Sequence, residues 1–115
     1  MNRYCLVIEL KEEFVEPYCE IHRHPWPELL KSIKDGGAKE LLIWNYKNLS
    51  IIYYEVEDID KLYEGLNKLE VTKKWNITVT PWFKTSIPMD ENGKFITCEK
   101  IFDLNQQLEG ELKPY

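Results

Sequence analysis

Two runs of apolar, β-branched and aromatic residues, close together in the middle of the chain, constrain the fold most strongly. They span residues 41–44 and 49–56, and the residues between them, 45–48, are short and polar enough for a hairpin. Two adjacent antiparallel strands are therefore predicted. Successive side chains of a strand alternate between its two faces, so Tyr53 and Tyr54 point to opposite sides of this pair.

The sequence before the hairpin predicts one strand and two helical segments. Residues 4–10 alternate and are rich in Val, Ile and Leu, which is typical of a strand, and the charged segment over 12–22 favours a helix. Pro25 interrupts this helix, because an interior proline loses a hydrogen bond and clashes with the preceding turn. The helical pattern resumes over 27–35 and ends at Gly36.

The sequence after the hairpin predicts a helix, a less regular helical segment and a last strand. Asp58 is a suitable N-cap, and apolar residues recur at spacings of three and four through a helix over 58–69. Residues 70–83 fit neither period well, and we expect a second helical piece there. A polar turn over 89–94 then leads into a strand over 95–102.

The predicted order is β-α-β-β-α-β, which makes the chain an α+β protein with a ferredoxin-like, four-stranded antiparallel sheet. The helices would cover one face of this sheet, and the other face needs a cover. Burial of the open face against a second copy is the simplest solution, so we predict a homodimer of the dimeric α/β barrel type. Residues 1–104 form a single domain in this interpretation, and residues 105–115 form a loosely ordered tail.

Composition narrows the class of partner. The 115 residues include 15 basic and 20 acidic side chains, with a net charge of -5 and no basic stripe, so nucleic acid is not an expected partner. The opening apolar run is too short for a signal sequence or a membrane span, and we expect a cytoplasmic protein with no membrane partner. The widely spaced Cys5, Cys19 and Cys98 predict neither a disulfide framework nor a zinc site.

Both histidines, His22 and His24, fall in one eight-residue stretch, which is where we expect any chemistry to lie. Histidine can both donate and accept a proton near neutral pH. Tyr18 lies four residues before His22, so these two side chains share a helix face, whereas His24 points elsewhere. Because the histidines diverge, no metal site is expected. Cys19 lies on a different face from His22, so a histidine-activated thiol is not favoured.

The remaining side chain types suit an uncharged ligand. No Gly-rich phosphate loop occurs in the sequence, so no nucleotide cofactor is expected. An imidazole, a phenol and several indoles are typical of a pocket for a hydroxylated molecule such as a sugar. The plainer interpretation is a helix end with a hydrogen-bonded imidazole and tryptophans that only pack in the core. It fits Trp44 and Trp82 best, and both interpretations stay open for Trp26 and Trp75.

One motif resembles a known family. The pattern consists of Tyr18-x-x-x-His22, Trp26-Pro27-Glu28-Leu29 and Gly37-Ala38. It is similar to the pattern of the L-rhamnose mutarotase family, and the likeness extends over nearly the whole chain. The resemblance implies a small dimeric enzyme that interconverts the α and β anomers of a 6-deoxyhexose, such as L-rhamnose, without a cofactor. It also implies that His22 donates a proton and that Tyr18 contacts the sugar.

Two positions depart from the family pattern. Leu41 stands where the family has a sugar-binding tyrosine, and Trp75-Asn76 stands where it has a pair of tryptophans. These departures change the polarity around the sugar, so L-fucose competes with L-rhamnose as the substrate. His22 is the predicted catalytic residue. The predicted substrate-binding residues are Tyr18, Trp26, Leu41, Trp75 and Asn76.

Several roles and functions stay open at this point. Ring opening needs a base as well as an acid, and Tyr18, Glu28, Glu55 or a bound water could be that base. A ferredoxin-like domain could also bind a small ligand without turning it over. A monooxygenase on the related dimeric barrel is a further alternative, with haem held by His22 or His24. The last alternative is an interaction protein whose aromatic residues all lie in the core and the dimer interface.

Overall fold

The computed structural model describes residues 1–110 and shows an α+β protein with a small antiparallel sheet. Its strands are β1 (Asn2–Glu9), β2 (Glu40–Tyr46) and β3 (Leu49–Val56). Its helices are α1 (Val15–Arg23), α2 (Pro27–Asp35), α3 (Ile59–Leu66), α4 (Glu70–Val79) and α5 (Leu104–Glu109), with 3-10 turns η1 (Glu12–Phe14) and η2 (Thr80–Trp82). The second helical piece expected over 70–83 is confirmed as α4 and η2.

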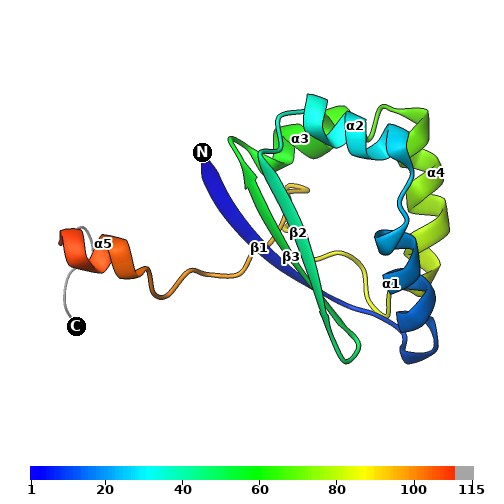
Figure 1. Cartoon of the computed structure of the whole chain (residues 1–115), viewed down its shortest axis with the longest axis horizontal. Coiled ribbons are helices and arrows are strands. Elements are labelled where there is room, and N and C mark those ends of the chain that lie inside the picture. Colours follow the sequence, from blue (N-terminus) through cyan, green and yellow to red (C-terminus); the bar gives the residue numbers. More distant parts are fainter. Residues whose placement is uncertain (111–115) are drawn as a thin grey trace.

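The sheet has the strand order β1-β3-β2, and both pairings are antiparallel. Helices α1 to α4 lie together on one side of it (Figure 1). The alternate residues of β3 that face these helices are buried: Ser50, Ile52, Tyr54 and Val56. They form one core with Leu6 and Ile8 of β1, Ala38, and Ile59, Leu62 and Leu66 of α3. The sheet face that carries Tyr54 is therefore the inner face, and the face that carries Tyr53 is the outer face.

Local sequence signals explain where the helices begin and end. α1 ends before His24, because the residue before a proline is disfavoured in helical conformation, and His24 has φ −130° and ψ 63°. α2 begins with Pro27 at its first position, where a missing N–H has no consequence. The Asp58 side chain caps α3 by accepting hydrogen bonds from the N–H groups of Asp60 and Lys61 at 3.0 and 3.2 Å.

The hairpin between β2 and β3 is confirmed and is tighter than predicted. Only Lys47 and Asn48 separate the strands, and Lys47 has a φ of 55°. The Asn45 side-chain amide donates to the carbonyls of Lys47 and Leu49 at 2.9 and 3.1 Å, which holds this short turn in place. β2 consequently extends through Tyr46, and Leu41 lies directly opposite Tyr54 in the register.

The strand predicted over residues 95–102 is wrong, because the described structure has a sheet of three strands and no strand in this segment. The segment touches the free edge of β1 where Cys98 N–H donates to the Cys5 carbonyl at 2.7 Å. A strand pairs stably when one of its faces is consistently apolar, but alternation here puts Glu99 on one face and Lys100 on the other. Phe102 is 63% exposed at the end of the segment.

The chain after this segment leaves the sheet. α5 lies apart from the helices that cover the inner face, on the other side of the sheet (Figure 1). The tail expected to be loosely ordered over 105–115 thus includes most of a short helix, and residues 111–115 lie outside the described residues. Within residues 1–110, none of the helices has the length and apolar character needed to cross a membrane.

Candidate active site

A cavity of about 450 Å³ is lined by residues of the inner face of the sheet and of helices α1 to α4. This volume falls within the range of roughly 300–1,000 Å³ that is typical of small-molecule sites. Most of its lining is apolar, and the described lining includes no Asp or Glu. The polar side chains in the lining are Tyr18, His22, Arg23, Asn45, Tyr54, Tyr63, Thr72 and Asn76.

Tyr18 and His22 project from one face of α1, as their spacing predicts. Their ring centroids are 4.2 Å apart. Tyr18 is 3% exposed, and its hydroxyl forms a 2.6 Å hydrogen bond with the Ser50 hydroxyl on the inner face of β3. This bond ties α1 to the central strand and fixes the helix that carries His22.

The hydrogen bond of His22 determines which of its nitrogens can react. Nδ1 lies 2.7 Å from the Tyr18 carbonyl oxygen, which can only accept, so Nδ1 carries a hydrogen. Nε2 is then the nitrogen that remains for a ligand. Burial lowers the pKa of His22 from its ordinary value of 6.5, and the backbone hydrogen bond opposes this shift only in part. The imidazole is therefore neutral at neutral pH, with a lone pair on Nε2.

Two tryptophans extend this group of aromatic side chains. The Trp75 ring meets the His22 ring edge-to-face, with centroids 5.3 Å apart, and Trp26 meets Trp75 in the same way at 5.1 Å. Trp75 lines the cavity, as do Leu41 and Asn76. Trp26 lines a separate depression with Glu28 and others, on the far side of Trp75. Of the predicted substrate-binding residues, Trp26 is thus the one that the structure places outside the cavity.

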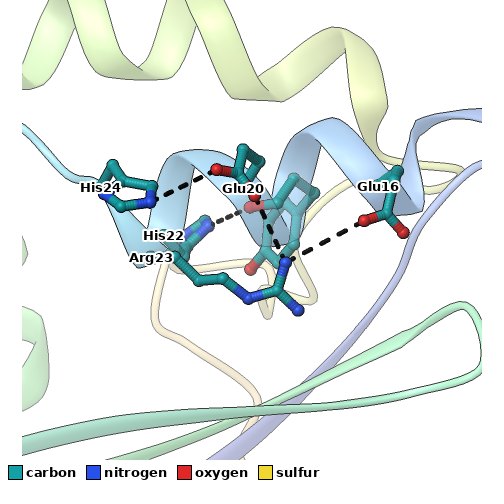
Figure 2. A network of polar contacts seen from close by, with 6 residues as sticks. Glu16, Glu20, His22, Arg23 and His24 are labelled. Atoms are coloured by element: carbon teal, nitrogen blue, oxygen red, sulfur yellow. Dashed lines mark hydrogen bonds and ion pairs between the residues drawn. The ribbon is translucent and has the colours of Figure 1, made fainter.

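His24 points away from His22, as predicted. Its Nε2 atom lies 3.4 Å from a Glu20 carboxylate oxygen, and its side chain is 78% exposed. Arg23 reaches Glu20 at 3.4 Å and Glu16 at 4.0 Å (Figure 2). Arg23 thus joins two glutamates along α1 and also lines the cavity, whereas His24 points to solvent and His22 is the histidine that faces the cavity.

Four hydroxyl-bearing residues of the cavity region were not predicted as site residues. Ser50 pairs with Tyr18, and Tyr54 pairs with Tyr63 through their hydroxyls. Burial raises the pKa of both Tyr54 and Tyr63, so both hydroxyls stay protonated. Thr72 lies on α4, one helical turn before Trp75. The signal for Ser50 was present, because a small polar residue at an inner position of an apolar strand needs a buried partner.

The described residues do not form a recognisable metal-binding site. Within residues 1–110, no three His, Cys, Asp or Glu side chains come together as a metal site would require. Cys19 lines the cavity and Cys5 and Cys98 do not, and all three thiols are free.

Known proteins resemble this chain in sequence and in structure. L-rhamnose mutarotase of Bacillus subtilis (strain 168) is 25% identical over 107 residues, which cover 91% of this chain and 100% of that protein. L-rhamnose mutarotase of Clostridium beijerinckii is 29% identical over 69 residues, which cover 59% of this chain and 66% of that protein. The crystal structure of L-rhamnose mutarotase FA22100 from Formosa agariphila aligns over 90% of this chain and 99% of that chain, with a TM-score of 0.67 and 21% identity, and supports the fold.

A family model settles the relationship. The model described as L-rhamnose mutarotase matches residues 3–104, which include every residue of the predicted site. This match favours an enzyme over a binding module, a monooxygenase or an interaction protein. The chain belongs to the L-rhamnose mutarotase family, a family of carbohydrate isomerases that interconvert the anomers of a sugar.

Proposed function

We propose that this chain interconverts the α and β anomers of a 6-deoxyhexose, with L-rhamnose as the first candidate and L-fucose as the second. One observation carries the proposal: the Nε2 atom of His22 has no hydrogen-bond partner among residues 1–110, and His22 lines a largely apolar cavity of about 450 Å³. An apolar lining suits the methyl group of a 6-deoxy sugar. The described lining has no Asp or Glu, and its Arg23 guanidinium is already paired with Glu20 and Glu16, which suits an uncharged substrate.

His22 performs the proton transfer in this proposal. Neutral Nε2 accepts the proton of the anomeric hydroxyl, and the resulting imidazolium donates that proton to the ring oxygen. The bond between the anomeric carbon and the ring oxygen breaks, and the anomeric carbon becomes an aldehyde. After rotation the ring oxygen attacks either face of the aldehyde, and the same proton returns through Nε2. The proton donation that the family resemblance implies for His22 is thus the second half of a relay.

The carboxylates considered as the base are remote from this relay. Glu28 is exposed and lies in the depression beside Trp26. Glu55 is on the outer face, where it accepts a hydrogen bond from Tyr53 at 2.9 Å. Because the ring oxygen and the anomeric oxygen are bonded to the same carbon, one nitrogen can serve both. We therefore assign no separate carboxylate base.

The predicted binding residues have distinct parts in this site. Trp75 offers an aromatic ring beside His22, and the buried Tyr18 hydroxyl lies on the sheet side of the imidazole. Asn76 is exposed at the cavity mouth and Leu41 is half-buried on the inner face of β2. Trp26 supports Trp75 from behind and has an indirect part. No cofactor takes part in the proposed reaction.

We also propose that the protein is a cytoplasmic homodimer with one domain over residues 1–104. Apolar side chains on the outer face support the dimer, because large exposed apolar patches on soluble proteins mark interaction surfaces. Leu42, Trp44 and Tyr46 of β2 are 41%, 55% and 59% exposed there. Three free thiols support a reducing compartment.

Saturation-transfer NMR tests the activity directly. The rate of exchange between α and β anomers is measured for L-rhamnose and for L-fucose, with and without the protein. Exchange well above the uncatalysed rate for either sugar supports the proposal, and the faster sugar is the better substrate. Exchange at the uncatalysed rate for both sugars would contradict it.

A further inference from the structure

Thr72 is buried without a hydrogen-bond partner. Its side chain is 4% exposed, and its Oγ1 atom has no partner among the described residues 1–110. Hydroxyls inside helices commonly bond to the carbonyl four residues back, as Thr78 does with Lys74 at 3.0 Å. For Thr72 that carbonyl belongs to Lys68, which precedes the helix. The hydroxyl is thus left for a partner from outside its own helix.

An unpaired buried hydroxyl needs an explanation. Taking a hydroxyl out of water without a new hydrogen bond is unfavourable, and native proteins keep few such atoms. A valine would fill the same space without this penalty. A threonine at this position is therefore explained best by a partner that arrives from the cavity and meets Oγ1 once the side chain turns towards it, because Oγ1 itself is enclosed in the structure described.

The position of Thr72 in the cavity defines that partner. Thr72, Trp75 and Asn76 line the same cavity from α4, because residues three and four apart share a helix face. Trp75 contacts His22, and Thr72 lies about one helical turn, roughly 5 Å, further along the axis. A pyranose ring whose anomeric carbon is at His22 would bring a hydroxyl from its other side towards Thr72.

The chemistry of the two groups matches. A threonine hydroxyl both donates and accepts, as a sugar hydroxyl does. Leu29 and Leu66 line the same cavity and offer a ligand no side-chain hydrogen bond. A site that leaves a buried polar atom unpaired when a substrate hydroxyl is missing discriminates strongly against the substrate that lacks it.

We propose that Thr72 Oγ1 is a specificity-determining contact, which hydrogen-bonds a ring hydroxyl of the sugar remote from the anomeric carbon. This inference rests on the proposed function and adds one residue to its binding site. A buried water could occupy the same position, but it would need further polar partners there. A water held only by the protein would not distinguish one sugar hydroxyl from another.

The test compares Thr72→Val, which keeps the shape and removes the hydroxyl, with Thr72→Ser, which keeps the hydroxyl. Anomer exchange is measured by NMR on the better sugar and on its monodeoxy analogues at each ring carbon other than the anomeric one. We expect Thr72→Val to lower kcat/KM about three- to tenfold, mainly through KM. Thr72→Ser should restore most of the loss.

The deoxy analogues and a stability measurement distinguish binding from folding. For one analogue, the one that lacks the contacted hydroxyl, Thr72→Val and the wild type should react equally well. Without sugar, Thr72→Val should unfold at the same temperature as the wild type or a higher one, because an unpaired hydroxyl has been removed. An equal effect of the substitution on every analogue, or no effect on any, overturns the inference.

A failure of the proposed function gives a different pattern. If the wild type binds a deoxyhexose by calorimetry but does not catalyse exchange, the same variants and analogues are compared by Kd, with the same pattern expected. If the wild type is active and Thr72→Val matches it on all sugars, only the assignment of Thr72 is wrong. If the wild type neither binds nor turns over any of these sugars, both proposals are wrong.

Discussion

The two faces of the same sheet differ in what covers them. On the inner face, Ile52 and Tyr54 are buried under the chain's own helices, which also enclose the cavity. On the outer face, the apolar side chains of β2, such as Trp44, are exposed, and no helix of the range α1 to α4 reaches them (Figure 1). Alternation along β3 produces both faces equally. Substitutions on the inner face should therefore change catalysis or stability, whereas substitutions on the outer face should change the association of two copies.

The largest expected effect is a loss of anomer exchange when His22, on the cavity side, is substituted. His22→Ala removes the proposed relay atom and should lower anomer exchange about 10²- to 10⁴-fold, which is the usual contribution of a positioned acid or base. The measurement is the NMR exchange rate at equal protein concentration. His24→Ala is the matched control, because His24 is on the same helix, points to solvent and should leave the rate unchanged. A similar loss in both variants would refute a specific role for His22.

The next largest effect concerns the outer face. Trp44→Glu places a charge in the proposed dimer interface and should weaken association roughly 30-fold or more, because tryptophans are frequent interface hot spots. Sedimentation velocity over a range of concentrations measures this. Ile77→Glu is the control, since Ile77 on α4 is also exposed, at 75%, but lies away from the sheet. A wild-type protein that sediments as a monomer at all concentrations would contradict the dimer.

A smaller effect is expected on the free energy of unfolding when a tyrosine of either face loses its hydroxyl. Tyr54→Phe leaves the Tyr63 hydroxyl without its partner on the inner side, which should lower the free energy of unfolding by about 1–3 kcal/mol. Tyr54→Phe/Tyr63→Phe should lose less than the sum of the single variants, because no hydroxyl is then left unpaired. Tyr46→Phe, on the outer face, should change little. Urea denaturation of the four variants checks this, and additive losses would mean that the two hydroxyls are not coupled.

Much of the inner face could be predicted from sequence because its signals are local. The spacing of Tyr18 and His22 defines a shared helix face, and the Asp58 cap and the hairpin follow from short-range chemistry. The cavity lining brought together by long-range packing could not be predicted. Thr72 is ordinary in sequence, and only its burial and its missing partner mark it.

The failures of prediction lie mostly where the chain leaves the helix-covered region. The strand over 95–102 was predicted to follow the polar turn over 89–94 and to close the sheet. Glu99 and Lys100 place a charged side chain on each face of this segment. Its pairing with the edge of β1 therefore does not extend beyond the hydrogen bond at Cys98. Trp26 is not such a failure, because its predicted contact with the sugar stays a prediction, but its place in the fold could not be read from the motif. Its motif places it close to His22 in sequence, but Pro25 turns the chain and Trp26 meets Trp75 from outside the cavity.

The smallest expected effect is the pH dependence of the exchange rate, which comes from His22 on the inner side of the sheet. Burial holds the pKa of His22 below 6.5, so Nε2 has its lone pair at pH 7 and loses it as the pH falls through that lowered pKa. The exchange rate should therefore be flat from pH 7 to 8 and should fall, by less than about tenfold, towards pH 5.5. The unfolded chain binds a proton at a higher pH than the folded one, so the contribution of His22 to stability is complete above pH 6.5 and is also lost on acidification. The unfolding midpoint measured at each pH separates the two effects, and His24→Ala should follow the wild-type rate profile. A rate that stays flat from pH 5 to 8 while the protein remains folded would count against the imidazole as the group that moves the proton.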